Sequence, residues 1–334
     1  MRILVTGAGG FIGGHLARRL LELGFQVRSF QRGSYPQLQQ DGIEVLQGDL
    51  GCKELVTEAV KDCCAVFHVA ALAAVSGPYR QFHRTNVTGT QYVIDACRQH
   101  GVEKLIYTSS PSVVFDGQDQ EGIDESVPYP RHYLAHYPRT KAMAERAVLE
   151  ANSPELATIA LRPHLVWGPG DRHLIPRILD RARAGKLKLI QREGTRIDAT
   201  YIDNAIDAHI AALESLSFAA PSGGKSYFIC NGEPMPVEQL IGGILQAAGL
   251  PAVKPTISPQ FAYLVGCILE WFHRIPGWRG EPVLTRFTAR QLATSHWFDI
   301  SAADRDLNWK PVVSTEEGLR RLSMSLSPAV ERTL

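Results

Sequence analysis

The sequence predicts an α/β protein: a doubly wound parallel sheet that carries a smaller, discontinuous α/β lobe. Through residue 163, short β-branched runs alternate with helical apolar periodicity, which is typical of βαβ units. A glycine-rich turn follows the first of these runs directly. After residue 163 the sequence becomes richer in proline and glycine, and the alternation loses its regularity. These observations favour one large domain and a second, less regular lobe.

Each expected element of the large domain has its own apolar pattern. The candidate strands are RILVT (2–6), FQVRSF (25–30), IEVLQ (43–47), AVFHV (65–69), KLIYTS (104–109) and TIALR (158–162). Helical periodicity covers the residues near 11–23, 52–62, 80–100 and 138–151, which lie between these strands.

A later stretch, RIDATYIDNAIDAHIAAL (196–213), again predicts a strand and then a helix, with Asp203 as the helix cap. We expect this stretch to return to the first domain. That domain would comprise residues 1–163 plus 196–219, and the second lobe would comprise residues 164–195 plus 220–330.

The composition is typical of a globular protein and excludes several classes of function. The chain is 45% hydrophobic and 21% charged, with a formal net charge of +1 and a pI near 7.7, so it offers no basic block for nucleic acid. The six cysteines form no C-x-x-C pair and no zinc spacing, so we expect reduced thiols and no metal site. We find no targeting leader and no bilayer-spanning apolar stretch, and we expect a cytoplasmic location.

The glycine turn VTGAGGFIGGHL (5–16) predicts a dinucleotide site. Gly7, Gly10 and Gly13 lie between a predicted strand and a predicted helix, where they allow a tight turn and close approach of backbone N–H groups to a pyrophosphate. The helix N-terminus adds the positive end of its dipole. A glycine triplet alone is weak evidence, but this context makes a dinucleotide-binding Rossmann domain much the better interpretation.

The end of the second predicted strand bears on the choice between NADP(H) and NAD(H). An NAD site usually has an acid there for the ribose 2′-hydroxyl, whereas this chain has SFQRG (29–33), with Gln31 and Arg32. The Arg32 guanidinium matches a 2′-phosphate, which favours NADP(H) and leaves NAD(H) open; the alternative is a solvated surface arginine. Asp49 and Leu50, just after the third strand, are placed to reach the adenine.

The segment HYPRTKAMAERAV (136–148) places Tyr137 and Lys141 on one helix face, because they are four residues apart. Pro138 is compatible with the first turn of that helix. A tyrosine with an ordinary pKa near 10 is a poor acid at neutral pH, and a neighbouring ammonium group favours its phenolate. Among ten tyrosines a chance match to this spacing is common, so the motif alone proves little.

The segment KLIYTSSPSV (104–113) supplies the context. It is a strand that ends in hydroxyl residues, at the edge where an open α/β sheet binds its ligands. Ser110 would hydrogen-bond a substrate carbonyl oxygen beside Tyr137, although turn chemistry alone would also explain Ser109 and Ser110. Because the glycine turn, the serine and the Tyr/Lys pair occur in the order of a single site, we expect a catalytic set of Ser110, Tyr137 and Lys141.

Nearly the whole chain resembles the extended short-chain dehydrogenases/reductases. The matching motifs are TGAGGFIG (6–13), GDL (48–50), HVAA (68–71), TNVTGT (85–90), YTSSPSV (107–113), YPRTK (137–141), LRPHLVWGPGD (161–171) and TYIDNAIDAH (200–209). The resemblance implies catalytic roles for Ser110, Tyr137 and Lys141. It also implies a set of cofactor contacts: Gly7, Gly10, Phe11, Ile12, Gly13, Arg32, Asp49, Leu50, Ala70, Ala71, Asn86, Tyr137, Lys141, Pro163 and His164.

The sequence departs from the motifs of this family at two places, and these differences indicate which branch of the family it resembles. Leu165 stands where sugar-nucleotide epimerases usually carry an asparagine, and Pro111 and Ser112 follow the catalytic hydroxyl where sugar dehydratases have acids. Both changes argue for an apolar substrate. The chain is most similar to the 3β-hydroxysteroid dehydrogenase-like branch and, within it, to the bacterial 2-alkyl-3-oxoalkanoate reductases of long-chain olefin biosynthesis.

This resemblance implies NADPH-dependent reduction of a 2-alkyl-3-oxoalkanoic acid to the 2-alkyl-3-hydroxyalkanoic acid. The alternative among enzymes is an NAD(P)-dependent 3β-hydroxysteroid or sterol-4-carboxylate 3-dehydrogenase. The alternative of another class is a catalytically inactive NADP(H)-binding sensor or scaffold, and the complete Ser/Tyr/Lys set argues against it.

The second lobe offers two features for an apolar substrate that carries a carboxylate. Arg172, His173 and Arg177 follow WGPGD and would meet the carboxylate, or else form a solvated basic loop. A helical apolar stripe predicts the core of this lobe; its members are Phe261, Leu264, Val265, Ile268, Leu269 and Phe272. The alternative is a wall or lid for alkyl chains, or a surface for a peripheral membrane or pathway-enzyme contact. We also expect a homodimer.

Overall fold

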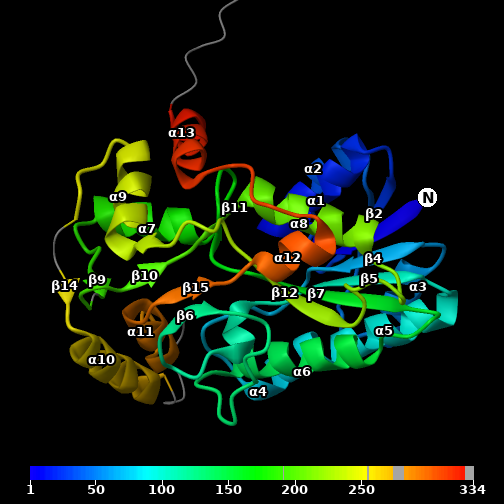
Figure 1. Cartoon of the computed structure of the whole chain (residues 1–334), viewed down its shortest axis with the longest axis horizontal. Coiled ribbons are helices and arrows are strands. Elements are labelled where there is room, and N and C mark those ends of the chain that lie inside the picture. Colours follow the sequence, from blue (N-terminus) through cyan, green and yellow to red (C-terminus); the bar gives the residue numbers. More distant parts are fainter. Residues whose placement is uncertain (191, 254–255, 274–281, 328–334) are drawn as a thin grey trace, which may run out of the picture.

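The centre of the molecule is a seven-stranded parallel sheet, which confirms the predicted fold class (Figure 1). The computed structural model describes residues 1–190, 192–253, 256–273 and 282–327. The strand order is β3–β2–β1–β4–β5–β7–β12, and it changes direction between β1 and β4, the switch point of an open α/β sheet. The bounds are β1 (Arg2–Thr6), β2 (Gln26–Gln31), β3 (Glu44–Gln47), β4 (Ala65–His68), β5 (Lys104–Thr108), β7 (Ala157–Pro163) and β12 (Lys225–Ile229).

Helices cover both faces of this sheet, and each helix face forms a core with it (Figure 1). One face carries α1 (Phe11–Glu22) and α8 (Ile202–Ser215); the other carries α3 (Lys53–Val60), α5 (Gly89–His100) and α6 (His136–Glu150). Since the strands are buried on both sides, they read as continuous apolar runs, and every residue of β7 is buried.

The predicted helix over residues 80–100 is interrupted. It consists of α4 (Tyr79–Phe82), a π-helical segment (His83–Thr88) and then α5. A π-helical turn inside a helix is rare and is often found beside functional sites. Here it contains Asn86, whose side chain accepts a hydrogen bond from the backbone of Leu72 in the loop after β4.

A short helix, α2 (Pro36–Gln40), follows the end of β2.

The smaller unit is built on a four-stranded sheet with the order β13–β10–β15–β6. Its strands are β6 (Gln120–Ile123), β10 (Arg196–Ile197), β13 (Met235–Pro236) and β15 (His296–Phe298). Two short ladders pair β8 (Val166–Trp167) with β11 (Thr200–Tyr201), and β9 (Leu189–Ile190) with β14 (Thr256–Ile257). The remaining helices of the described chain are a 3-10 turn (Pro111–Val114), α7 (Leu174–Arg183), α9 (Val237–Ala247), α10 (Pro259–Phe272), α11 (Arg286–Ala293), α12 (Ser301–Leu307) and α13 (Thr315–Leu326); α12 packs on α8 and β12, and the 3-10 turn packs on α6.

The sheets do not follow the predicted boundary between the two units. Strand β12 lies inside the range 220–330, yet it pairs in parallel with β7 at the edge of the large sheet. Its residues Tyr227, Phe228 and Ile229 are buried there, so the edge position is stabilised by apolar packing. Conversely, β6 and β10 belong to the small sheet although the sequence assigned them to the first domain.

The expected cap of α8 is also different. Asp203 lies in the first turn of α8 rather than at its N-cap, which is Tyr201, and it makes no capping hydrogen bond. Its carboxylate instead pairs with Arg321 of α13, with 2.9 Å between Oδ2 and Nη1. An acid in the first turn still interacts favourably with the helix dipole. The dipole therefore explains an aspartate near the start of this helix even though Asp203 is not the cap.

Helix α10 is orientated opposite to the expectation. Its buried residues are the small ones, Ala262 and Gly266, which pack towards α11. Large members of the predicted core stripe lie outside: Phe261 is 56% exposed, and Leu264, Ile268 and Phe272 are also exposed. Trp271, which lies off the stripe, is exposed as well. The prediction that this stripe forms the core of the second lobe is therefore wrong, because close helix packing selects the face with small side chains.

The six cysteines all lie in the described part of the chain. All six cysteines are free, and burial raises the pKa of the Cys63 thiol to about 11. The described part of the chain contains no helix with the length and apolarity needed to span a bilayer.

Candidate active site

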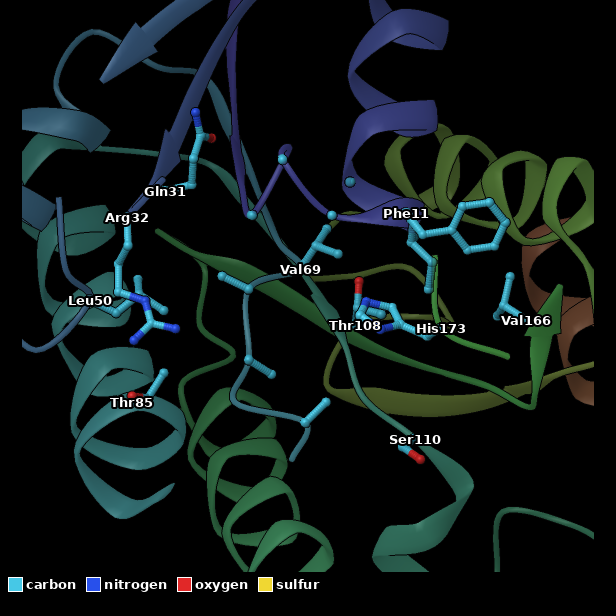
Figure 2. Close-up of a pocket in the computed structure, with 18 of the residues that line it drawn as sticks. Phe11, Gln31, Arg32, Leu50, Val69, Thr85, Thr108, Ser110, Val166 and His173 are labelled. Atoms are coloured by element: carbon cyan, nitrogen blue, oxygen red, sulfur yellow. The ribbon is translucent and has the colours of Figure 1, made fainter. Parts of the chain in front are cut away.

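A cavity of about 570 Å³ lies at the carboxyl ends of the parallel strands, where the strand order changes direction. It is lined by the glycine turn, by the ends of β2, β4, β5 and β7, and by the start of α6. Figure 2 shows Arg32, Leu50 and Thr85 at one end of it, with Ser110, Val166 and His173 towards the other. Its size is within the range of about 300–1,000 Å³ that is typical of small-molecule sites.

The glycine turn has the geometry that a phosphate cradle needs. Gly7 has φ 76°, a left-handed conformation that glycine adopts without strain, and its carbonyl oxygen accepts a 2.9 Å hydrogen bond from the Gly10 N–H. A Cβ at Gly13 would come within 2.4 Å of the Gly7 carbonyl oxygen, so only glycine permits this close packing of helix on turn. The first turn of α1 therefore opens directly into the cavity with its unpaired N–H groups.

The end of β2 supplies the polar groups for the adenosine half of a dinucleotide. Arg32 is exposed, and Figure 2 shows its side chain directed towards Leu50 and Thr85 across this end of the cavity. The Gln31 side-chain oxygen Oε1 is buried and has no hydrogen-bond partner among the described residues. Asp49 Oδ1 accepts a 2.7 Å hydrogen bond from the Gly51 N–H, which fixes the loop after β3. The residues present thus fit an adenosine ribose and its phosphate.

Ser110 begins the 3-10 turn that follows β5. Its Oγ accepts hydrogen bonds from the Ser112 N–H, at 3.2 Å, and from the Ser112 hydroxyl, at 3.0 Å. With both acceptor positions used, the Ser110 hydroxyl is left to act as a donor, to the Tyr137 oxygen or to a ligand in the cavity. The neighbouring Ser109 hydroxyl is buried and has no partner within the described ranges, so it is a second polar group available to a ligand.

Tyr137 lies at the start of α6 and lines the same cavity. Burial raises the pKa of its phenol, and a hydrogen bond with Ser110 works in the opposite direction. The phenol is therefore protonated at neutral pH in the free protein, and Ser110 lines the same cavity. Such a pair can hold a carbonyl oxygen and give it a proton.

Lys141 follows one turn later and is fully buried. Its Nζ donates a 2.6 Å hydrogen bond to the Thr108 carbonyl oxygen and lies 4.0 Å from the centre of the Tyr107 ring. Burial lowers the pKa of the ammonium group to about 7, and the negative charge of Glu145 offsets part of that effect. Lys141 is thus a cation held close to its neutral form, at the base of the cavity.

Most of the residues expected to contact the cofactor line the cavity, but Asn86 and His164 do not. The Asn86 side chain is buried, bonding the backbone N–H and carbonyl of Leu72 and the Thr140 hydroxyl, so it ties the loop after β4 to α6. The His164 Nδ1–H donates a 2.6 Å hydrogen bond to the Asp198 carbonyl oxygen. Burial lowers the pKa of His164 to about 4. Both residues lie behind the cavity lining and hold neighbouring segments in place through these hydrogen bonds.

A buried chain of hydrogen bonds holds the loop after β4. Thr6 Oγ1 accepts from the Val69 and Ala70 N–H groups, both at 3.1 Å, so it must donate its proton to His68 Nδ1 at 2.8 Å. His68 therefore carries its proton on Nε2 and donates it to Thr90 Oγ1 at 2.9 Å. Burial lowers the pKa of His68 to about 3, so the ring stays neutral and the tautomer is fixed.

The basic segment after WGPGD is only partly at the site. His173 lines the cavity and Arg172 does not. Asp171 accepts hydrogen bonds from the backbone N–H groups of His173, Leu174 and Ile175, so its carboxylate caps the start of α7. The expectation that these basic residues meet a carboxylate stays a prediction.

Sequence reasoning missed two residues at the site. Thr108 anchors Lys141 through its carbonyl oxygen, and its hydroxyl donates to His209 Nε2 at 2.8 Å. The sequence feature that could have identified Thr108 is its position as the last residue of a strand that ends in hydroxyl residues. Tyr35 lies against Gly9 and lines the cavity, but nothing in its loop sequence distinguishes it from a surface residue.

A glycine turn with unpaired N–H groups, and a serine, a tyrosine and a lysine in one cavity, define an NAD(P)-dependent oxidoreductase of the extended short-chain type. Residues 4–259 match the model of the 3-beta hydroxysteroid dehydrogenase/isomerase family, and the chain belongs to that family.

Relatives of known name support this assignment along the full length of the chain. The chain is 49% identical over 327 residues to a 2-alkyl-3-oxoalkanoate reductase of Stenotrophomonas maltophilia (strain K279a), with 97% of this chain and 99% of the relative covered. A Mus musculus sterol-4-alpha-carboxylate 3-dehydrogenase, decarboxylating, is 35% identical over 96% of this chain and 90% of its own. The solved structure of MoeE5 in complex with UDP-glucose and NAD has a TM-score of 0.75 and 26% identity, and covers 97% of this chain and 98% of its own.

Proposed function

We propose that the protein reduces a 2-alkyl-3-oxoalkanoic acid to the 2-alkyl-3-hydroxyalkanoic acid with NADPH, as a step of long-chain olefinic hydrocarbon biosynthesis. The observation that carries the proposal is the hydroxyl pair of Ser110 and Tyr137 at one end of a dinucleotide cavity, next to apolar walls. The 49% identity to a reductase of that name supports the choice of substrate.

The apolar wall lies directly after β7. Leu165 and Val166 line the cavity, and Leu174 of α7 joins them. Leu165 has φ 45°, a left-handed conformation that costs a leucine about 1–3 kcal/mol and that surrounding structure must maintain. A strained leucine in place of a hydrogen-bonding amide suits an alkyl-substituted ketone and not a sugar diphosphate.

The chain's own residues perform the proton chemistry. A bound nicotinamide supplies the hydride. Ser110 donates a hydrogen bond to the carbonyl oxygen and holds it beside the Tyr137 hydroxyl, which gives its proton to the developing alkoxide. Lys141 stabilises the phenolate that remains, because its ammonium group is the buried cation of the site.

Arg32 supports NADPH as the preferred cofactor. It occupies the position after β2 where an acid would accept the ribose 2′-hydroxyl, and its guanidinium extends across the adenosine end of the cavity (Figure 2). A 2′-phosphate is the group that this cation would meet.

The reaction is tested most cleanly in the direction of alcohol oxidation, because free 3-keto acids lose carbon dioxide in water. Purified protein with NADP should oxidise 2-alkyl-3-hydroxyalkanoic acids, and absorbance of the reduced nicotinamide reports the rate. The sterol alternative is supported by the 35% identity to the mouse enzyme, so 3β-hydroxysteroids are the matched panel. Turnover of the steroids without turnover of the hydroxy acids would reverse the proposal.

We propose in addition a homodimer in the cytoplasm, with the exposed face of α10 as the surface for a membrane or a pathway enzyme. Its exposed aromatic and aliphatic residues support such a contact. Light scattering after size exclusion measures the oligomeric state. Sedimentation with anionic lipid vesicles separates a membrane contact from a protein contact. We also propose a division into two units, with β12 in the first unit and β6 and β10 in the second.

A further inference from the structure

A second cavity, of about 510 Å³, lies beside the first, between the small unit and the start of α6. Figure 1 shows α10 and α11 on the side of the molecule where α4 and the start of α6 lie. The wall on the large-domain side comes from the loop after β4, from Phe82 and from residues 134–136; the opposite wall comes from the end of α10 and the start of α11. This size again suits a small molecule or part of one.

Two chain segments run continuously from one cavity into the other. In the loop after β4, Ala73 lines the first cavity and Val75 lines the second. At the start of α6, His136 lines the second cavity and Tyr137 lines the first. Tyr137, which lines the first cavity, is therefore next in sequence to a residue that lines the second.

Four apolar side chains form part of the lining of the second cavity, beside its polar groups. Phe82 and Phe287 are both buried, and Val75 and Leu134 join them. The Phe287 ring meets the Phe115 ring edge to face, with 6.0 Å between centroids. Phe115 directly follows the 3-10 turn that Ser110 begins, so this wall is connected to the catalytic serine.

Two polar groups of the second cavity, Glu270 and Arg286, pair with one another. The Glu270 carboxylate accepts from the Arg286 backbone N–H at 2.7 Å and from Arg286 Nε at 2.8 Å. The Thr285 hydroxyl is engaged with Thr288 in the cap of α11. The Arg286 side chain is 40% exposed, so the neutral ion pair lies towards solvent and leaves the apolar walls to a ligand.

We propose that this second cavity binds the alkyl chain attached to the ketone carbon of the substrate, and that it makes the enzyme selective for long chains. The inference rests on the proposed function, since it needs a ketone held at Tyr137. Each methylene that leaves water is worth ~0.8 kcal/mol, which corresponds to about a fourfold gain in kcat/KM. The apolar side chains in the lining and the pairing of Glu270 with Arg286 favour an alkyl chain over a second charged group.

The test uses 2-methyl-3-hydroxyalkanoic acids with NADP, in which the chain beyond the carbinol carbon is ethyl, pentyl, octyl or undecyl. In the wild type, kcat/KM should rise with chain length by up to about fourfold per methylene. Val75→Trp and Leu134→Trp fill the cavity from different segments, and each should reduce the undecyl-to-ethyl ratio of kcat/KM at least ~30-fold, the loss of a few buried methylenes.

Val312→Trp is the matched control, because Val312 is 76% exposed and lines neither cavity; it should keep the wild-type ratio. A ratio that stays unchanged in both filling variants, or a wild type without chain-length dependence, overturns the proposal.

Binding of dodecanoate, measured by calorimetry, separates failure of this inference from failure of the proposed function. If no hydroxy acid is oxidised but dodecanoate binds the wild type and not Val75→Trp, the proposed reaction fails and the chain site stands. If the hydroxy acids are oxidised and dodecanoate binds both proteins equally, the reaction stands and the chain site fails. Absence of dodecanoate binding to the wild type also overturns the chain site.

Discussion

Lys141 donates a 2.6 Å hydrogen bond from Nζ to the carbonyl oxygen of Thr108, which joins α6 to the end of the central strand β5. The Thr108 hydroxyl in turn donates to the neutral ring of His209 on α8. The ammonium group is therefore held by a backbone carbonyl on an element that α6 and α8 cover from opposite faces of the sheet. Among the described residues no carboxylate forms an ion pair with Lys141, and this leaves its charge available to the site.

Lys141→Met should abolish catalysis and stabilise the fold at neutral pH. The pKa of Lys141 is lowered to about 7, so the folded state binds fewer protons than the unfolded state between about pH 7 and pH 10.5. The cost of burying the charged group is thus largest at or below pH 7 and declines as the pH rises. Urea unfolding at pH 6.5 and pH 9.5 measures the difference; kcat should fall at least ~100-fold.

The stabilising effect of Lys141→Met should shrink at the higher pH. Equal differences in unfolding free energy at both pH values would show that the buried charge is not the cause. Lys61→Met, at an exposed position after α3, is the control and should change neither quantity.

Tyr137→Phe should reduce kcat by at least ~100-fold and leave the dissociation constant for NADPH within about threefold, because it removes one acidic hydroxyl and keeps the ring. Fluorescence titration measures cofactor binding, and steady-state oxidation of the hydroxy acids measures turnover. Tyr92→Phe, on α5 and outside the cavity, is the matched control. A Tyr137→Phe enzyme with near-wild-type turnover would remove tyrosine from the mechanism.

Arg32→Ala should raise KM for NADPH by about 10- to 100-fold and change KM for NADH by less than about threefold. The reason is that a charge-assisted hydrogen bond to the 2′-phosphate is worth ~1.5–3 kcal/mol and NADH lacks that phosphate. Initial rates with each cofactor give both constants. Equal losses for the two cofactors would refute the role of Arg32 in choosing between them.

Acid should destabilise the protein between about pH 6.5 and pH 4. Burial lowers the pKa of His68 and His296 to about 3, and that of His164 and His209 to about 4. In this range the unfolded chain binds up to one more proton at each of these histidines, so unfolding free energy falls by up to ~1.4 kcal/mol per pH unit for each ring.

Urea midpoints at several pH values measure this acid sensitivity. His209→Asn should reduce the slope, whatever it costs in overall stability, whereas His132→Gln at an exposed position should keep it. Identical slopes in all three proteins would assign acid unfolding to other groups.

Local patterns were sufficient for the elements that carry the cofactor site. β1 was predicted at its observed bounds, because a buried strand that runs into a glycine turn has few alternatives. Ser110, Tyr137 and Lys141 reach one cavity because parallel strands and the helices after them meet at one sheet edge.

Other features depend on tertiary contacts that periodicity does not contain. The short strand β12 occupies an edge whose partner, β7, lies more than sixty residues earlier. The apolar stripe on α10 shows which residues share a face but not which face is buried. Helix α11 packs on the other face of α10, because Ala262 and Gly266 permit close approach there. Asn86 and His164 are close in sequence to residues that line the cavity, but they do not line it themselves. Asn86 instead forms hydrogen bonds with Leu72 and Thr140, and His164 forms one with Asp198.

The path of β12 also limits how the protein can be dissected. The edge strand of the large sheet, β12, follows β8 to β11 of the small unit in the sequence. A fragment that stops at residue 163 would lack both this strand and α8, and would expose β7 and the part of one sheet face that α8 covers. The two units should consequently melt in a single calorimetric transition, and limited proteolysis should yield no stable half.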